Sequence, residues 1–262
     1  MKSHKSRCIS KNTTHTNNLM KFTKKKKKKT TEQIIEGLKT CLFSCEDFPK
    51  PEGDSLHLKR AILINQTDED KKNLQTMIKV FITSEDLNCL NDALQYTISD
   101  LELPCINSVI LSYQHKTNET QNILEKLLFM WKTLEDLVVQ GLITSIGISD
   151  VDTDVFINLY NAVEVKPSIH QINLSACCVV PPDLQEFCKE HDIRILTHND
   201  PFDILPVNIL KPLFQVNNEK NEADETKRFS NINVAWVTRF QAHIKCRGIL
   251  SNKGYIVRLN LR

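Results

Sequence analysis

The amino-acid sequence predicts an α/β fold with a mainly parallel sheet, in the form of a (β/α) barrel. Apolar runs typical of strands alternate with amphipathic stretches typical of helices from about residue 60 onward, and this alternation indicates βαβ units. About seven strand candidates favour a barrel over a doubly wound sheet. The 262 residues, 40% of them hydrophobic, are enough to bury one large core.

The first part of the chain already shows this alternation. Apolar residues from Ile34 to Leu42 have helical spacing, and Ala61–Ile64 is a short apolar run. Met77–Thr83 (MIKVFIT) has the β-branched composition of a strand, Leu87–Ile98 places leucines on one helical face, and Ser108–Leu111 is the next strand. These last three segments form a predicted strand–helix–strand unit.

The rest of the chain continues the pattern. Ile123–Val139 is the clearest helix, because its apolar residues form one stripe and Gly141 stands where a glycine cap would end it. The elements expected after it are strand Ile143–Ile148, a helix capped by Asp152, strand Ile169–Leu174, a helix from Pro182 to Cys188, strand Ile193–Thr197 and a final apolar segment, Ile232–Leu261.

One folded domain, residues 32–262, is expected behind a basic tail. Residues 1–31 are polar and are predicted to be disordered, and residues 215–230 are predicted to form a flexible surface insertion. The net charge of +2 includes the unbroken run Lys24–Lys29, so the remainder is mildly acidic. The run would suit nuclear import or an acidic surface, but a solvated tail is favoured. No nucleic-acid partner is expected.

The composition predicts a cytoplasmic protein without membrane contact. No apolar stretch approaches the ~18 residues of a membrane span, and residues 1–29 lack the apolar core of a signal peptide. The nine cysteines are therefore expected to be reduced. No C-x-x-C pair occurs, and Cys41 and Cys45 have no histidine cluster beside them, so no metal site is predicted.

Three segments resemble the aldo-keto reductases. Leu137–Ser149 (LVVQGLITSIGIS) is similar to the helix and strand that end in Ser-Asn in that family, and Lys166–Leu196 is similar to the strand and helix that follow. Val80–Leu111 resembles an earlier strand–helix–strand unit. The resemblance spans about residues 60 to 250 and implies a TIM-type (β/α)8 barrel, incomplete or divergent at its N-terminal strands.

A non-catalytic branch of that family is more similar still. The string NLSACCVVPPDL (Asn173–Leu184), the segment Thr197–Pro201 (THNDP) and the tail Cys246–Ile256 resemble the regulatory, or modifier, subunits of glutamate–cysteine ligase. This resemblance implies a regulatory subunit that forms a heterodimer with the catalytic subunit. It also implies tuning of that subunit's glutamate affinity and glutathione feedback inhibition in glutathione biosynthesis.

The catalytic groups of a reductase do not occur at the matching positions. The family pattern requires a tyrosine acid before the strand that carries a lysine, and then a histidine. The first tyrosine here is Tyr96, which comes too late; Glu85 stands at the lysine position, and Ser112 at the histidine position, with His115 three residues beyond. No enzymatic activity is therefore expected. The alternative function, an NADPH-dependent aldo-keto oxidoreductase, would need a lysine at position 85 and a tyrosine upstream of it.

Residues that match the family's cofactor site are Ser149, Asp150 and Gln171. Ser149 and Asp150 would otherwise cap the next helix, and Gln171 would satisfy buried polar groups. Lys245 and Arg247 are placed by the resemblance near the cofactor's phosphate. No cofactor is expected, and residual NADPH binding is kept as a hypothesis.

The candidate intersubunit thiols are Cys177, Cys178 and Cys246. The first two follow a strand at the carboxyl face of the predicted barrel, where loops carry function. Adjacent cysteines do not bridge each other easily, so the resemblance implies a disulfide to the catalytic subunit; burial as small apolar residues is the equal alternative. Cys246 has basic neighbours that would lower the pKa of its thiol.

Overall fold

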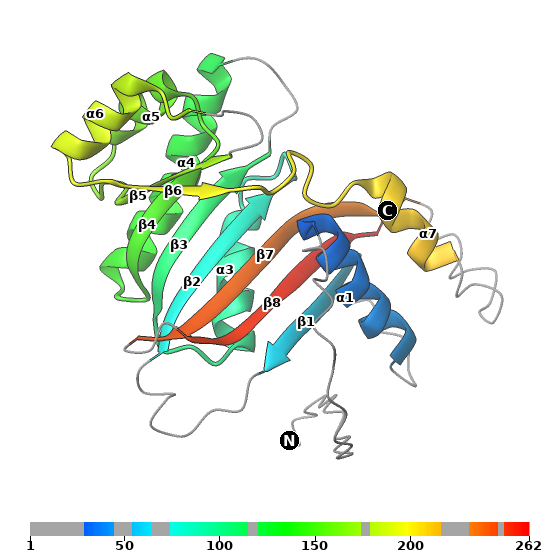
Figure 1. Ribbon diagram of the computed structural model, residues 1–262. Helices are drawn as coiled ribbons and strands as arrows, with labels where there is room; N and C mark the ends of the chain where they lie inside the picture. Colours follow the sequence, from blue (N-terminus) through cyan, green and yellow to red (C-terminus); the bar gives the residue numbers. More distant parts are fainter. Residues whose placement is uncertain are drawn as a thin grey trace.

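An eight-stranded sheet with helices on both faces organises the protein (Figure 1). The computed structural model describes residues 29–44, 54–63, 74–114, 120–173, 179–215, 231–245 and 249–261. The strand order across the sheet is β1-β8-β7-β2-β3-β4-β5-β6. Consecutive strands from β2 to β6 are therefore neighbours in space, whereas β1 pairs with the last strand of the chain.

The parallel half of the sheet confirms the predicted βαβ units. Its neighbouring strands pair in parallel from β2 through β6, and helices follow them as crossovers. The strands are β2 (Leu74–Ile82), β3 (Ile106–Tyr113), β4 (Ile143–Ser149), β5 (Ile169–Asn173) and β6 (Arg194–His198). The helices are α3 (Cys89–Asp100), α4 (Thr120–Val139), α5 (Thr153–Ala162) and α6 (Pro182–Glu190).

The other half is antiparallel and is where the fold diverges. The final apolar segment forms two long strands, β7 (Asn233–Ile244) and β8 (Ile249–Asn260), and β8 pairs with β1 (Ser55–Leu63). Within the described residues β1 and β6 each pair with one neighbour, so these strands form an open sheet and do not close into a ring. The predicted α/β fold is confirmed, and the divergence expected at the N-terminal strands is found in β1.

Two further helices, α1 (Thr30–Ser44) and α7 (Val207–Gln215), complete the described elements. Helix α1 begins within the last two residues assigned to the tail; residues 1–28 of the tail, and 216–230 of the predicted insertion, lie outside the described residues. No helix in the described ranges is both long enough and apolar enough to cross a bilayer.

The two faces of the sheet bury separate cores. Helices α3 to α6 cover one face, where Val80, Leu111 and Ile148 pack with Trp131 and Phe156. Helix α1 lies over the other face in the antiparallel half (Figure 1), where a second core is built from residues of α1, α7, β1, β2, β7 and β8. Its members include Ile34, Leu38, Phe81, Phe214, Val237 and Val257. Because side chains alternate along a strand, Lys79 shares the face of Phe81.

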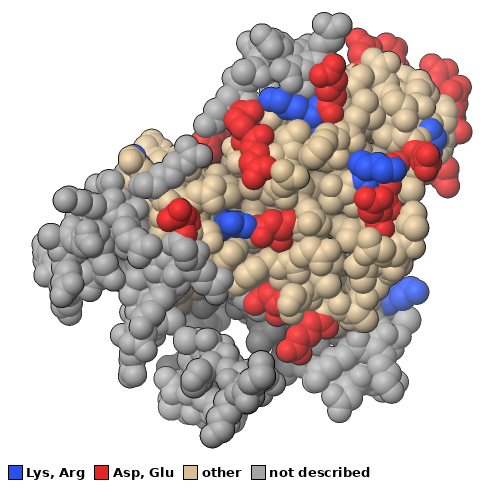
Figure 2. Space-filling view, turned by 180° about the vertical axis from the view of Figure 1, so that it is seen from behind, with Lys and Arg blue, Asp and Glu red and all other residues tan. Residues whose placement is uncertain are grey.

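Charged side chains are interspersed on the side of the sheet where α3 lies. In the space-filling view from behind, Lys and Arg lie among Asp and Glu over the described part of the surface (Figure 2). No continuous basic area forms on this described surface.

Candidate functional site

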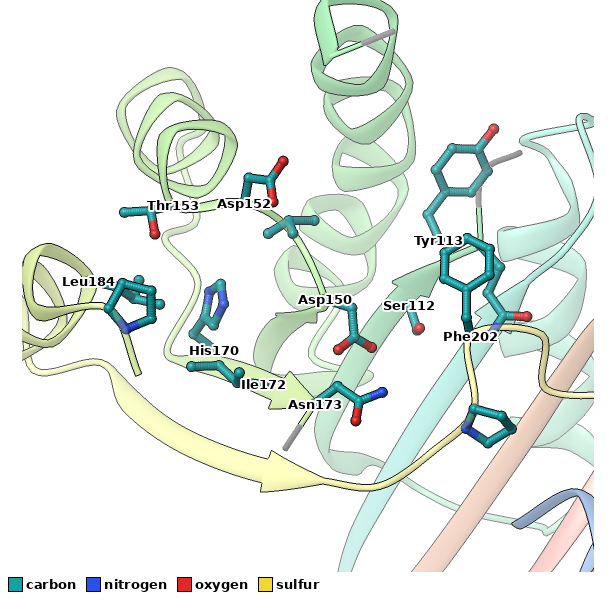
Figure 3. A pocket seen from close by; sticks show the side chains of 14 residues that line it. Ser112, Tyr113, Asp150, Asp152, Thr153, His170, Ile172, Asn173, Leu184 and Phe202 are labelled. Atoms are coloured by element: carbon teal, nitrogen blue, oxygen red, sulfur yellow. The ribbon is translucent and has the colours of Figure 1, made fainter. Parts of the chain in front are cut away.

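A cavity of about 350 Å³ opens where the parallel strands β3, β4 and β5 end (Figure 3). We call it the edge pocket. Ser112 and Tyr113 line it from β3, Asp150 from the turn after β4, and His170 from β5. The first turns of α5 and α6 and the segment after β6, which includes Phe202, form the rest of its wall. The carboxyl edge of a parallel sheet is the usual position of ligand sites in α/β proteins.

Asp150 has an unusual backbone conformation at this edge. Its φ angle is +61°, in the left-handed region that non-glycine residues seldom adopt. Its N–H donates to the Gln171 carbonyl oxygen at 3.0 Å, and Ser149 donates a hydrogen bond from Oγ to Asp150 Oδ2 at 2.8 Å. These contacts hold a strained turn, and such strain concentrates at functional positions.

Behind Asp150 lies a buried group of charges, which we call the Lys79 cluster. It comprises Lys79, Ser149, Asp150, His198, Asp200 and Arg239. The Lys79 ammonium donates to Ser149 Oγ at 2.9 Å and to Asp200 Oδ2 at 3.1 Å, and lies 3.8 Å from Asp150 Oδ2. Lys79 and Asp200 expose only 2% and 3% of their side chains, so water screens this pair weakly.

His198 joins the two aspartates of the cluster. Its Nε2 lies 2.8 Å from Asp150 Oδ1, and its Nδ1 accepts a hydrogen bond from the Asp200 N–H at 3.1 Å. The neutral tautomer with the proton on Nε2 satisfies both contacts. In the charged form Nδ1 carries a proton and would donate to the carboxylate of Asp200, 3.1 Å away, in place of accepting from the Asp200 N–H.

Asp200 connects the cluster to the helix at the start of the described chain. Its Oδ1 accepts from Arg239 at 2.5 Å and from the Thr30 hydroxyl at 2.8 Å. Helix α1 is further held where Thr31 donates to the Ile204 carbonyl oxygen at 3.1 Å. One carboxylate therefore links α1, β2 and β7.

Burial and pairing shift the pKa values of the cluster in different directions. Burial lowers the pKa of Lys79 to about 8, against the opposing charges of Asp200 and Asp150. Burial alone would raise the pKa of both aspartates, but the hydrogen bonds from His198 and the positive charges nearby outweigh it and hold both below their ordinary value. For His198, the hydrogen bonds to Asp150 and Asp200 overcome burial and raise the pKa.

Across the sheet from the cluster, His170 forms part of the pocket wall. It is 1% exposed, and its ring packs edge-on against Phe156 at 4.2 Å between centroids. Burial lowers the pKa of His170 to about 4, although the charge of Asp150 acts the other way. Its Nδ1 has no hydrogen-bond partner among the described residues, which leaves a neutral and unsatisfied polar atom at the pocket.

The predicted cofactor residues share this region but are not arranged for a ligand. The Ser149 hydroxyl is already engaged with Lys79, Asp150 and His198, while Gln171 is 6% exposed and its Oε1 has no partner in the described chain. Lys245 follows the end of β7 that pairs with the start of β2, so it lies at the opposite edge of the sheet from the pocket. Arg247 lies outside the described residues.

These residues do not fit NADPH, the cofactor that the family resemblance implies. A carboxamide would have to displace the internal partners of Ser149, and none of the residues that line the edge pocket is a lysine or an arginine for the phosphates. The cluster instead satisfies its own polar groups, as buried charges generally require.

The positions that match the catalytic lysine and histidine of a reductase lie at the ends of β2 and β3. Glu85 lies beyond the end of β2, where its side chain is 69% exposed and pairs with Lys126 at 3.1 Å. Ser112 is buried at the end of β3 and lines the edge pocket. Tyr255, opposite Arg239 on neighbouring strands, has a pKa raised by burial, and a proton-donating tyrosine would need the opposite shift.

Sequence reasoning missed most of the cluster. Lys79 and Arg239 were not singled out, and His198 and Asp200 appeared only within the matched segment Thr197–Pro201. The lysine inside the apolar strand MIKVFI was a usable signal, because a buried lysine requires a partner. The candidate thiols Cys177, Cys178 and Cys246, together with His115, lie outside the described residues.

Comparisons with known proteins place these features in context. The chain is 40% identical over 134 residues to the glutamate–cysteine ligase regulatory subunit of Rattus norvegicus, which covers 51% of this chain and 47% of the relative. It is 39% identical over 139 residues to that of Homo sapiens, covering 53% and 48%. The chain spans about half the length of the curated relatives it matches.

Solved reductase structures are more distant. An aldo-keto reductase from a deep-sea metagenome library matches with 17% identity and a TM-score of 0.38 over 46% of this chain and 42% of that one. A Bombyx mori aldo-keto reductase in complex with NADP matches with 20% identity and a TM-score of 0.37 over 47% and 40%. These values carry no weight for the site.

The family model described as the aldo/keto reductase family matches residues 64–252. This range includes the parallel strands β2 to β6, the edge pocket and the Lys79 cluster. The chain therefore belongs to the aldo/keto reductase family.

Proposed function

We propose that this chain is a non-catalytic regulatory subunit of glutamate–cysteine ligase, which binds the catalytic subunit in the cytoplasm and tunes its glutamate affinity and glutathione feedback inhibition. The observation that carries the proposal is the 40% identity over 134 residues to a regulatory subunit of that enzyme. The alternative, a working reductase, has weaker support, because the nearest match to its catalytic lysine is the exposed Glu85.

The Lys79 cluster supports a non-catalytic role. Lys79 and His198 pair with two aspartates, and the six residues of the cluster include no tyrosine that could donate a proton to a carbonyl. Of the cluster, Asp150 is the one residue that lines the edge pocket. A carbonyl compound in the pocket would therefore meet a carboxylate, which destabilises the oxyanion that hydride transfer creates.

A subunit without chemistry of its own regulates through differential binding. If it binds one state of the catalytic subunit more tightly, it shifts the population toward that state. A change of one order of magnitude in apparent glutamate affinity needs a difference of about 1.4 kcal/mol in binding free energy between the two states. A modest interface suffices for such a difference.

The decisive experiment reconstitutes the complex. The full chain and the catalytic subunit of the same organism are purified, mixed and separated by size, and the KM for glutamate and the inhibition constant for glutathione are measured with and without this chain. We expect a 1:1 complex, a lower KM and weaker inhibition. Failure to form a complex, or unchanged constants in a complex that forms, contradicts the proposal.

The candidate thiols are tested in the same system. We include in the proposal a disulfide between the catalytic subunit and Cys177, Cys178 or Cys246. Under non-reducing electrophoresis, Cys177→Ser combined with Cys178→Ser, or Cys246→Ser alone, is expected to remove the linked species. Cys188→Ser is the matched control, because burial raises the pKa of this thiol to about 11 and keeps it unreactive.

A further inference from the structure

The edge pocket combines apolar walls with an acidic side. Leu184 and Ile172 line it together with the aromatic rings of Tyr113 and Phe202, and Phe202 remains 67% exposed. The charged residues of its lining are Asp150 and Asp152. Asp154 and Asp183 lie in the first turns of α5 and α6, the helices that border the pocket. An anion would meet repulsion from this set.

The Asp150 carboxylate is a hydrogen-bond acceptor in the pocket, beside the hydroxyl and amide groups of Ser112, Thr153 and Asn173. The Asp150 side chain is 34% exposed while it pairs with the cluster, and a carboxylate has room for about four hydrogen bonds. His170 lies on the pocket wall, almost fully buried, with Nδ1 lacking a partner in the described chain. Its ring points toward the start of α5 near Thr153 (Figure 3). Buried polar atoms without partners are rare and call for an explanation.

We infer that the edge pocket binds a small organic cation, an ammonium group carried on an apolar or aromatic body. The ammonium donates hydrogen bonds to the Asp150 carboxylate, whose side chain is partly exposed in the pocket. The apolar body lies against Leu184 and Ile172, and Phe202 covers it at the mouth, where an aromatic face also attracts a cation.

The size and the ligand type are consistent with this assignment. A cavity of about 350 Å³ is at the lower end of the range of metabolite sites. A bare metal ion does not fit, because no three His, Cys, Asp or Glu side chains among the described residues are placed to hold a metal ion together. The Lys79 ammonium does not bind an anionic ligand, because it is already paired with Asp150 and Asp200.

The test uses the full chain and two probes of similar shape. Phenethylamine carries an ammonium at neutral pH and 3-phenylpropionate carries a carboxylate on a comparable ring and chain. Isothermal titration calorimetry is expected to detect phenethylamine binding and no 3-phenylpropionate binding. Equal binding of both probes, or no heat from phenethylamine up to about 10 mM, overturns the inference.

Variants locate the binding in the pocket. Asp150→Asn removes the negative charge that the ammonium contacts and is expected to weaken phenethylamine binding by about tenfold or more. Leu184→Trp fills the cavity without changing a charge and is expected to abolish binding. It also keeps the test valid if Asp150→Asn disturbs folding. Asp154→Asn, which removes a carboxylate outside the pocket lining, is expected to change affinity by less than about twofold. Unchanged affinity in folded Leu184→Trp contradicts the site.

Discussion

The ammonium nitrogen of Lys79 lies 3.1 Å from a carboxylate oxygen of Asp200, and 121 positions of sequence separate the two residues. Both side chains are almost completely buried. The pair joins the second strand of the sheet to the segment after β6, and Asp200 extends it to Arg239 and Thr30. A contact between such distant positions contributes to stability only when the whole sheet is assembled.

Replacing Lys79 by methionine is expected to destabilise the protein strongly. The change leaves Asp150 and Asp200 with less compensating charge in a buried environment, so we expect the free energy of unfolding to fall by about 3 kcal/mol. Urea unfolding followed by circular dichroism measures it. Lys126→Met is the control, because its partner Glu85 is largely exposed and such surface pairs contribute about 1 kcal/mol or less. If the free energy of unfolding fell equally in the two variants, the buried ion pair would contribute no more to stability than the surface pair.

His170 is expected to make the protein sensitive to acid. Its folded-state pKa of about 4 lies below the ordinary value of 6.5, so the unfolded chain binds more protons between these values and stability falls as the pH drops. From pH 7 to 4.5 this single group should remove about 2 kcal/mol. Over the same pH interval, the free energy of unfolding of His170→Phe should fall by that amount less than the free energy of unfolding of the parent protein. Parallel stability curves for the two proteins would exclude His170 as the source.

His198 is expected to show the opposite dependence. Its pKa is raised in the folded protein by Asp150 and Asp200, so its stabilising effect is complete below its unfolded pKa and is lost as the pH rises through the folded value. The stability difference between the parent and His198→Gln should therefore be larger at pH 6 than at pH 8. Chemical unfolding at both pH values checks the sign, and a difference that grows toward pH 8 refutes the assignment.

Gly147 is expected to tolerate no side chain. A Cβ atom there would lie 2.6 Å from both the Cβ and the carbonyl oxygen of Ile169 on the adjacent strand. Gly147→Ala should lower the free energy of unfolding by about 1–3 kcal/mol through overpacking. Gly141→Ala is the comparison: its φ of +74° is strained for alanine, but no atom lies within 4 Å, so a cost of about 1 kcal/mol is expected. A larger loss at Gly141 would contradict the close approach of the strands.

Restoring a lysine at position 85 is not expected to restore reduction. Glu85→Lys would place a second positive charge beside Lys126 on the surface. Proton transfer to a carbonyl would need a buried lysine, and position 85 is exposed. NADPH oxidation with a panel of aldehydes, followed by absorbance, should remain at the rate of the protein-free control. Measurable turnover by Glu85→Lys or by the parent protein would favour the reductase alternative.

The regular elements of the parallel half were predictable from local sequence. The stripe of apolar residues in α4 and the β-branched strand β2 carry their periodicity within a few residues, and the structure confirms both. The antiparallel half was harder. Ile232–Leu261 was expected to complete the fold, but its division into β7 and β8, and the pairing of β8 with β1, depend on partners far away in the sequence.

The residues of the site also differ in how far the local sequence could identify them. Ser149, Asp150 and Gln171 were proposed as cofactor residues because a resemblance of short segments pointed to them, and all three lie near the carboxyl ends of the parallel strands. Lys79, His198 and Asp200 were not found as a group, because no local spacing relates a residue in β2 to residues near the end of β6. The unsatisfied nitrogen of His170 could not be anticipated either, since it depends on which side chains surround the ring.

By itself, the sequence determined the α/β class, the order of the parallel units and the relationship to the reductases, because periodicity and short matching strings are local properties of the chain. The tertiary structure alone decided that the described strands form an open sheet with an antiparallel half. It also decided that Lys79 is neutralised by aspartates and that a pocket with acceptor groups lies beside them. Those properties arise from contacts between residues separated by many tens of positions, and their energies depend on burial that exists only in the folded state.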